Sequence, residues 1–224
     1  MEFSEVVRRR RMVRAYDPDR PLPGGLLDRL VDVALRAPTA GFTQGVSFLI
    51  LEDAADRERF WSATTSDPTT SDPTTAAAKP DSWLRGMRTA PGLILVLASA
   101  DAYLDRYALA DKGWTDRSTE PWTAPYWYVD AGMAGMAILY ATVDADPDGR
   151  LGACFFGVPA DRVDRTKQAF AVPGGQDIVG VVSVGYRAEG ERQSGSPRTR
   201  RRRSRESLVH HGQWQPGDGP PAKG

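Results

Sequence analysis

Apolar side chains recur at a helical period in the first part of the chain. Residues 26–35 carry leucine, valine and alanine at the 3.6-residue spacing of an amphipathic helix. Pro38 predicts the end of this helix, because a proline pushes the residue before it out of the α region. Residues 17–25 are rich in proline and glycine and predict a linker. Before the linker, residues 4–14 predict a helix with Ser4 as its N-cap.

Predominantly apolar segments predict buried strands at residues 46–52 and 91–100 and a third strand at residues 177–186. The run at 91–100 is apolar along nearly its whole length, which predicts burial on both faces of a sheet. A shorter apolar segment at residues 151–157 is a fourth candidate strand.

Three further segments, at residues 53–63, 126–143 and 160–170, predict helices. Residues 126–143 are too short and too polar to cross a bilayer, which needs about 20 apolar residues. We therefore predict a buried central helix in which Asp130 is a hydrogen-bonded structural carboxylate or a helix-end group, with a catalytic role as the alternative. Residues 101–120 are polar and predict irregular structure.

Helices alternate with strands through residues 1–186, which predicts one α+β domain, an α/β sandwich around a central sheet. Within it, residues 64–75 repeat the unit TTSDP and carry no apolar side chain, so we expect a flexible insertion over 64–80. Residues 187–224 form a basic C-terminal arm with the run RTRRRRSR at 198–205.

Composition narrows the classes of function. The 224 residues are 41% hydrophobic and 26% charged, as in a globular protein. Lys+Arg and Asp+Glu number 29 each, so the chain lacks the basic excess of a nucleic-acid binder. The single cysteine, Cys154, excludes a disulfide framework or a multi-cysteine zinc site, and we expect it to be a small buried hydrophobe. The only histidines, His210 and His211, lie near the C-terminus and argue against a histidine-based catalytic or metal centre in the core.

We therefore expect no metal site. The N-terminus lacks the apolar segment of a secretory signal, so a cytoplasmic setting is the default expectation.

Three segments could carry binding chemistry. Arg10 and Arg14 share one face of the predicted helix and could grip a phosphate with forked hydrogen bonds, or form a solvated basic face. Small residues in 37–45 would let a flat ligand approach the backbone, although the segment could also be an ordinary connection. The run at 198–205 could bind phosphate or nucleic acid, or could simply be solvated.

A group of aromatic side chains lies before and within the start of the central helix. These side chains could line a pocket for a planar substrate, or they could pack in the core. The group comprises Trp114, Trp122, Tyr126, Trp127 and Tyr128.

The order of these segments resembles that of the nitroreductase family of FMN-dependent oxidoreductases. The family pattern R-R-S-x-R stands here as RRMVR at residues 10–14, and A-P-S-x-x-N-x-Q-P-W-x-F stands as APTAGFTQGVSF at residues 37–48. A D-x-G-x-A helix, the segment LGACFFG and a basic arm follow in the same order. The resemblance extends from about Val6 to Val209.

The resemblance implies a mixed sheet wrapped by helices in an intertwined homodimer, with FMN at the dimer interface and the C-terminal arm packed on the partner subunit. It places Arg10 and Arg14 at the FMN phosphate, the loop around Thr39 against the flavin of the other subunit, and the backbone of residues 156–157 at the ring edge. The cofactor-binding residues that it implies are Arg10, Arg11, Met12, Arg14, Pro38, Thr39, Ala40, Gln44, Phe156, Gly157, Arg200 and Arg202.

This sequence departs from the family pattern at several positions. Met12 stands where the family has a serine, and Gly45 and Val46 replace Pro-Trp. Phe42 replaces an asparagine and could narrow the substrate site. The implied lining of that site is Phe42, Trp122, Tyr126 and Trp127.

The implied activity is hydride transfer from NADH or NADPH to flavin N5 and then to an electron-poor acceptor, such as a nitroaromatic or a quinone. No G-x-G-x-x-G follows a strand, so we expect no dedicated dinucleotide site. One alternative is a specialised FMN-dependent dehydrogenase or oxidase acting on a peptide-derived or other small substrate. A more distant alternative is binding of an anionic surface or nucleic acid through residues 198–205. Zero net charge disfavours that reading, and we expect neither a nucleic-acid nor a membrane partner.

Overall fold

The computed structural model describes residues 1–65, 82–114, 116–191 and 201–214. Within the chain, contacts separate two compact units, Met1–Glu191 and Arg192–Gly224. The first unit holds every helix and strand discussed below. The predicted insertion over 64–80 falls almost wholly outside the described residues.

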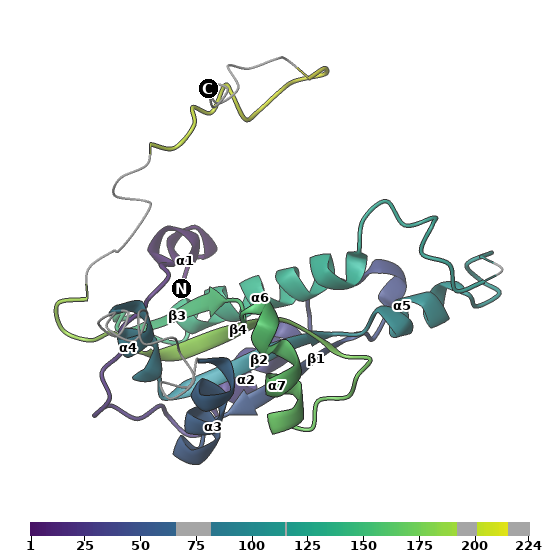
Figure 1. The fold of residues 1–224 in the computed structure, drawn as a ribbon. Helices are drawn as coiled ribbons and strands as arrows, with labels where there is room; N and C mark the ends of the chain where they lie inside the picture. The colour runs from purple at the N-terminus through teal and green to yellow at the C-terminus, as the bar shows by residue number, and fades with distance from the viewer. Residues whose placement is uncertain (66–81, 115, 192–200, 215–224) are drawn as a thin grey trace, which may run out of the picture. The chain divides into compact units, whose positions relative to one another are not determined.

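Four strands form one sheet in the order β1-β2-β4-β3, and each neighbouring pair is antiparallel. The strands lie side by side in Figure 1. All four apolar runs identified in the sequence are strands. Their bounds are β1 Val46–Leu51, β2 Gly92–Ala98, β3 Leu151–Phe156 and β4 Asp177–Tyr186.

Helices cover both faces of this sheet. On one face α2 (Leu26–Ala34) and α6 (Tyr126–Asp144) pack on β2 and β4, and on the other lie α3 (Ala54–Thr64), α4 (Ser82–Arg88) and α7 (Val163–Ala169). Figure 1 shows α6 on one side of the sheet and α3 and α7 on the other. The sheet is therefore the middle layer between two hydrophobic cores.

Strand β2 is the centre of both cores. All of its residues are buried, as its continuous apolar run predicts. Ile94 and Val96 pack on the α2 and α6 side, whereas Leu93 and Leu95 pack on the α3 and α4 side. By contrast, β1 is an edge strand in which only Leu51 is fully buried, so the prediction of a buried strand was wrong for most of β1.

One aromatic ring joins the sheet to α6. The Phe155 ring lies where Gly135 of α6 and Gly180 of β4 have no side chain; a Cβ atom built on either glycine would be within 3 Å of ring carbons of Phe155. The two glycines therefore create the space that lets α6 pack closely on β3 and β4.

The first helix is shorter than predicted. The prediction of a helix over 4–14 was wrong after Arg9, because α1 spans Phe3–Arg9 and its N-cap is Glu2. Met12 pairs with Ala153 in an isolated parallel bridge, and the Val13 N–H donates to the Ala153 carbonyl at 3.0 Å. Val13 is buried against β3, and this burial of a β-branched side chain favours extended backbone over another helical turn.

Residues 101–120 are not wholly irregular as predicted. Helix α5 spans Ala100–Tyr107, and the Ser99 side chain caps it by accepting from the Ala102 N–H at 3.3 Å. The exposed face of α5 is polar, so no apolar periodicity indicated a helix there. Tyr103, on the other face, is fully buried. The remaining short elements are the 3-10 turns η1 (Ala40–Phe42) and η2 (Ala160–Arg162).

The fold class is confirmed: helices enclose a central sheet in an α+β domain. Parallel pairing among the described residues is limited to the bridge beside β3. Of the helices in the described part of the chain, none combines the length and apolar character that crossing a bilayer requires.

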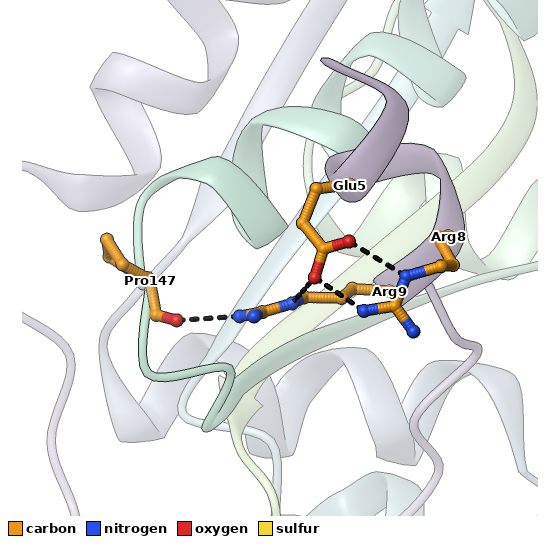
Figure 2. A network of polar contacts seen from close by, with 4 residues as sticks. All are labelled: Glu5, Arg8, Arg9 and Pro147. Carbon is orange, nitrogen blue, oxygen red and sulfur yellow. Dashed lines mark hydrogen bonds and ion pairs between the residues drawn. The ribbon is translucent and has the colours of Figure 1, made fainter. Parts of the chain in front are cut away.

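An ionic network attaches α1 to the turn after α6 (Figure 2). The Glu5 carboxylate accepts from Nη2 of Arg8 at 2.6 Å and from Nε of Arg9. Arg9 also donates through Nη1 to the Pro147 carbonyl at 2.8 Å. The hydrogen bonds from Arg8 and Arg9 lower the pKa of Glu5 from 4.5 to about 2.

The packing of Phe155 predicts opposite effects for two alanine substitutions in α6. Gly135→Ala should lower the free energy of unfolding by about 1–3 kcal/mol, because the new methyl group overpacks the core. Gly132→Ala meets no atom within 4 Å and should raise it by up to about 1 kcal/mol through helix propensity. Chemical denaturation measures both values. A Gly135→Ala protein as stable as the wild type would contradict this packing.

The Glu5 network predicts a pH-dependent contribution to stability. Because the folded-state pKa of Glu5 is depressed, its contribution is complete above about pH 4.5 and is lost as the pH falls toward 2. Glu5→Gln should therefore lower the denaturation midpoint at pH 7, and the difference from wild type should shrink through this window. A difference that stays constant from pH 7 to about pH 2 would exclude ionised Glu5 as its cause.

Candidate functional site

A cleft of about 410 Å³ opens between the segment after α2, strand β1 and the first half of α6. Pro38, Thr39, Phe42 and Gln44, all singled out in the sequence, line it together. The complete lining is Ala34, Leu35, Arg36, Ala37, Pro38, Thr39, Phe42, Thr43, Gln44, Val46, Phe48, Asp130 and Ala134.

The buried carboxylate of Asp130 holds the cleft loop, residues 39–42, by a hydrogen bond. Oδ2 of Asp130 accepts from the Ala40 backbone N–H at 2.7 Å and from the Tyr103 hydroxyl at 2.7 Å. Asp130 is only 2% exposed, so the two hydrogen bonds supply the partners that a buried charge requires. The prediction that this carboxylate is hydrogen-bonded is confirmed.

Helix α5 contacts the same loop from its other side. Nε of Arg106 donates to the Gly41 carbonyl at 3.0 Å, while its Nη atoms pair with Asp111. Burial and the hydrogen bond to Asp130 raise the pKa of Tyr103, so its hydroxyl stays protonated and remains a donor.

Phe42 stands out in this loop. Its side chain is 83% exposed, and its φ of 56° lies in the left-handed region that residues other than glycine rarely adopt. The loop fixes this backbone locally: the Phe42 N–H donates to the Thr39 carbonyl at 3.1 Å, and Nε2 of Gln44 donates to the Phe42 carbonyl at 3.2 Å. The ring is therefore presented at the mouth of the cleft by a constrained backbone.

The predicted phosphate-binding arginines lie outside the cleft lining. Because α1 ends at Arg9, Arg10 and Arg14 do not share a helix face as predicted; they flank Met12 beside the edge of β3. Nη1 of Arg10 is buried and has no hydrogen-bond acceptor among the residues that the structure describes. Arg14 is half-buried and donates through Nη1 to the Met12 carbonyl at 3.2 Å.

Arg11 lies in a second cavity of about 330 Å³, at the end of α6 and the start of β3. Arg8 and Arg9 line it too, but Glu5 already pairs with both (Figure 2). Arg187 also lines this cavity, and in the described part of the chain its buried Nε finds no hydrogen-bond acceptor. No sequence pattern pointed to Arg187, which the pairing of β3 with β4 and the antiparallel bridge from Tyr16 to Arg187 bring close to the N-terminal arginines.

Phe156 and Gly157 stand at the end of β3. The Phe156 ring stacks on Trp61, with centroids 5.8 Å apart and planes 8° apart, so this side chain is part of a core cluster. Gly157 is exposed, and a Cβ atom built on it meets nothing within 4 Å. Its peptide is therefore open to a ligand.

The other predicted substrate-site aromatics form a cluster beside the cleft rather than lining it. The Trp122 centroid lies 4.4 Å from Tyr107, 5.7 Å from Tyr126 and 6.0 Å from Trp127. Trp127 also lies 6.3 Å from Tyr103, the residue that hydrogen-bonds Asp130. The cluster therefore packs directly against the group that holds the loop.

Apart from the aromatic cluster, the predicted site residues of the first unit lie in two groups. Pro38, Thr39, Phe42 and Gln44 line one cleft, whereas residues 10–14 lie beside β3 and residues 156–157 lie at its end. Of the predicted C-terminal arginines, Arg200 lies outside the described residues and Arg202 is exposed in the second unit.

Comparison with known proteins gives one clear family. The sequence profile of the Nitroreductase family matches residues 7–186. No curated protein matches the sequence.

Solved structures share the fold at low sequence identity. NfrA1 from B. megaterium is 18% identical with a TM-score of 0.68, covering 97% of this chain and 77% of that one. A nitroreductase family protein from Clostridium difficile 630 is 18% identical with a TM-score of 0.66, covering 96% and 100%. A Desulfovibrio desulfuricans protein solved in complex with FMN is 18% identical with a TM-score of 0.64, covering 96% and 99%.

The profile match covers most of the chain, and these structures share its arrangement of helices around a sheet. The chain therefore belongs to the nitroreductase family.

Proposed function

We propose that this protein is a homodimeric, FMN-dependent oxidoreductase that takes electrons from NADH or NADPH and passes them to an electron-poor acceptor such as a nitroaromatic or a quinone. The observation that carries the proposal is the cleft that Pro38, Thr39 and Gln44 line. These residues belong to the loop whose Ala40 N–H donates to Asp130. Family membership supports an oxidoreductase, and a relative of the same fold binds FMN.

The arginines fit a phosphate group. Nη1 of Arg10 and Nε of Arg187 are buried donors without an acceptor in residues 1–65, 82–114, 116–191 and 201–214. Leaving such a charged donor unpaired costs at least about 1–3 kcal/mol. A phosphate oxygen would satisfy donors of this kind with charge-assisted hydrogen bonds. The chain needs no net positive charge for this, because the cations are local.

We assign the FMN phosphate to Arg10 and Arg14, with Arg11 and the Met12 backbone beside it. The exposed peptide at Gly157 would face the ring edge, together with the Phe156 backbone. From the other subunit, Pro38, Thr39, Ala40 and Gln44 would contact the ring, and Arg200 and Arg202 would add cations. Bound FMN supplies the hydride-accepting and hydride-donating chemistry.

The cleft residues lie apart from residues 10–14 and 156–157 beside β3, and this separation supports a dimer. Exposed apolar side chains cluster on α2, the cleft loop and the first half of α6: Leu35 is 64% exposed, Val129 44% and Met133 39%. An exposed apolar surface of this kind marks an interaction site. In a homodimer, the loop of one subunit would complete the cofactor site of the other.

The remaining side chains position the reactants and exclude water. Phe42, Val46 and Phe48 give the cleft apolar walls suited to a planar acceptor. Asp130 is already an acceptor for two hydrogen bonds, so we assign it no acid–base role.

The phosphate assignment predicts the effect of removing either arginine. Arg10→Ala and Arg14→Ala should each weaken FMN binding by about 1.5–3 kcal/mol, the scale of a hydrogen bond to a charged group, or roughly 10- to 150-fold. Fluorescence titration of apoprotein with FMN measures this loss. Arg165→Ala, which removes an exposed guanidinium on α7, is the matched control and should bind as the wild type does. Unchanged affinity in both test variants would contradict the assignment.

The proposed activity predicts a redox-sensitive spectrum. The purified protein should show the two visible flavin bands, which should bleach when NADPH is added without oxygen and return when a quinone follows. Bands that persist with both NADH and NADPH would favour the dehydrogenase-type alternative. A colourless protein that cannot be reconstituted with FMN would overturn the proposed function.

A further inference from the structure

The cleft loop is held by contacts to two helices that lie far from it in sequence. Asp130 of α6 accepts from Ala40, 90 residues away, and Arg106 of α5 donates to Gly41, 65 residues away. Within the loop, the Thr43 hydroxyl donates to the Ala40 carbonyl at 2.6 Å. Both backbone groups of Ala40 are therefore engaged.

Two glycines let α5 approach the loop this closely. A Cβ atom on Gly45 would lie 2.5 Å from the Tyr103 ring, and one on Gly41 would lie 2.8 Å from the Tyr107 ring. Gly41 also has a φ of +65°, which favours glycine on backbone grounds. The close approach brings the Tyr103 hydroxyl to Asp130.

The Asp130 carboxylate joins these contacts at the wall of the cleft. Its Oδ2 takes one hydrogen bond from the loop and one from α5, and the residue lines the cleft with Pro38 and Phe42. A displacement of this oxygen would move Ala40, and with it the constrained backbone that presents Phe42.

We propose that Asp130 is the positioning residue of the cofactor and acceptor site: through the Ala40 N–H it fixes residues 39–42, and Tyr103 in turn fixes Asp130. This inference rests on the proposed function, because it assigns a task to residues of that same site. Residues 39–42 include the Thr39–Ala40 segment that we place against the flavin and the Phe42 ring that we place against the acceptor. Misplacing a site by about 1 Å is enough to cost a large factor in rate.

The chain contains a matched control for this proposal. Asp146 is also buried, at 9% exposure, and follows the opposite end of α6. It too accepts two hydrogen bonds, from the backbone N–H groups of Arg150 and Leu151, each at 2.8 Å. Asp146 stabilises a turn and does not line the cleft, so its removal costs stability without touching residues 39–42.

The experiment compares Asp130→Ala, Asp146→Ala and Asp130→Asn in the full-length FMN-bound protein. Both alanine variants should lower the melting temperature. Only Asp130→Ala should raise the FMN Kd, by about tenfold, the scale of a lost hydrogen bond to a charged group, and raise the KM for a quinone more than it lowers kcat. Asp130→Asn should recover most of the FMN affinity, because its amide oxygen can accept from both Ala40 and Tyr103.

The flavin absorbance spectrum gives a second readout that a purely structural role would not move. It should shift in Asp130→Ala and stay as in the wild type in Asp146→Ala. If Asp130→Ala does not fold, Tyr103→Phe, which removes one donor and keeps the ring, should still raise the quinone KM. Equal effects of Asp130→Ala and Asp146→Ala on Kd and KM, or none in Tyr103→Phe, would overturn the inference. A wild-type protein that binds no FMN would instead overturn the proposed function.

Discussion

The hydrogen bonds to Oδ2 of Asp130 are the constraint on which the rest of the site depends. A carboxylate buried in an apolar helix is costly without partners, so α6 can pack on the sheet only if donors reach this oxygen. One donor comes from a loop and the other from α5. The requirement of a single buried charge therefore fixes where three separate segments of the chain meet.

The cleft inherits its rigidity from the same packing. Helix α6 cannot shift easily, because the Phe155 ring fills the space left by Gly135 and Gly180. Strand β2 is buried on both faces and anchors the two cores. The loop at residues 39–42 is thus hydrogen-bonded to a helix that packs on the fully buried strand of the domain, although the loop lies at the surface.

Long apolar patterns predicted most of the fold from the sequence. All four strands and the central helix are found close to their predicted places, because continuous apolar runs reflect burial in the sheet or beneath it. The predictions were wrong for two segments in which tertiary contacts determine the backbone conformation. Residues 10–14 are extended because Val13 packs beside β3, and α5 forms although its pattern is mostly polar. The local signals for α5 were the Ser99 cap, the acidic Asp101 in the first turn and the basic Arg106 in the last.

The candidate site was predictable only in part. The A-P-T-A-G segment led to the cleft loop, and the isolated Asp130 in an apolar helix indicated a hydrogen-bonded group. Neither pattern could identify Ala40 and Tyr103 as the partners of Asp130, or Arg106 as the partner of Gly41. Those contacts span 27 to 90 residues. Arg187 was not predictable for the same reason: the pairing of β3 with β4 and the bridge from Tyr16 to Arg187 bring it to the N-terminal arginines.

The extended backbone after α1 changes the reach of the arginine segment. In a helix, four residues advance about 6 Å along the axis, so two arginines at that spacing would lie close together on one face. In an extended segment the same four residues advance about 13 Å. Arg10 and Arg14 are therefore spread along a line beside β3, and both guanidinium groups reach one phosphate only when their long side chains converge on it.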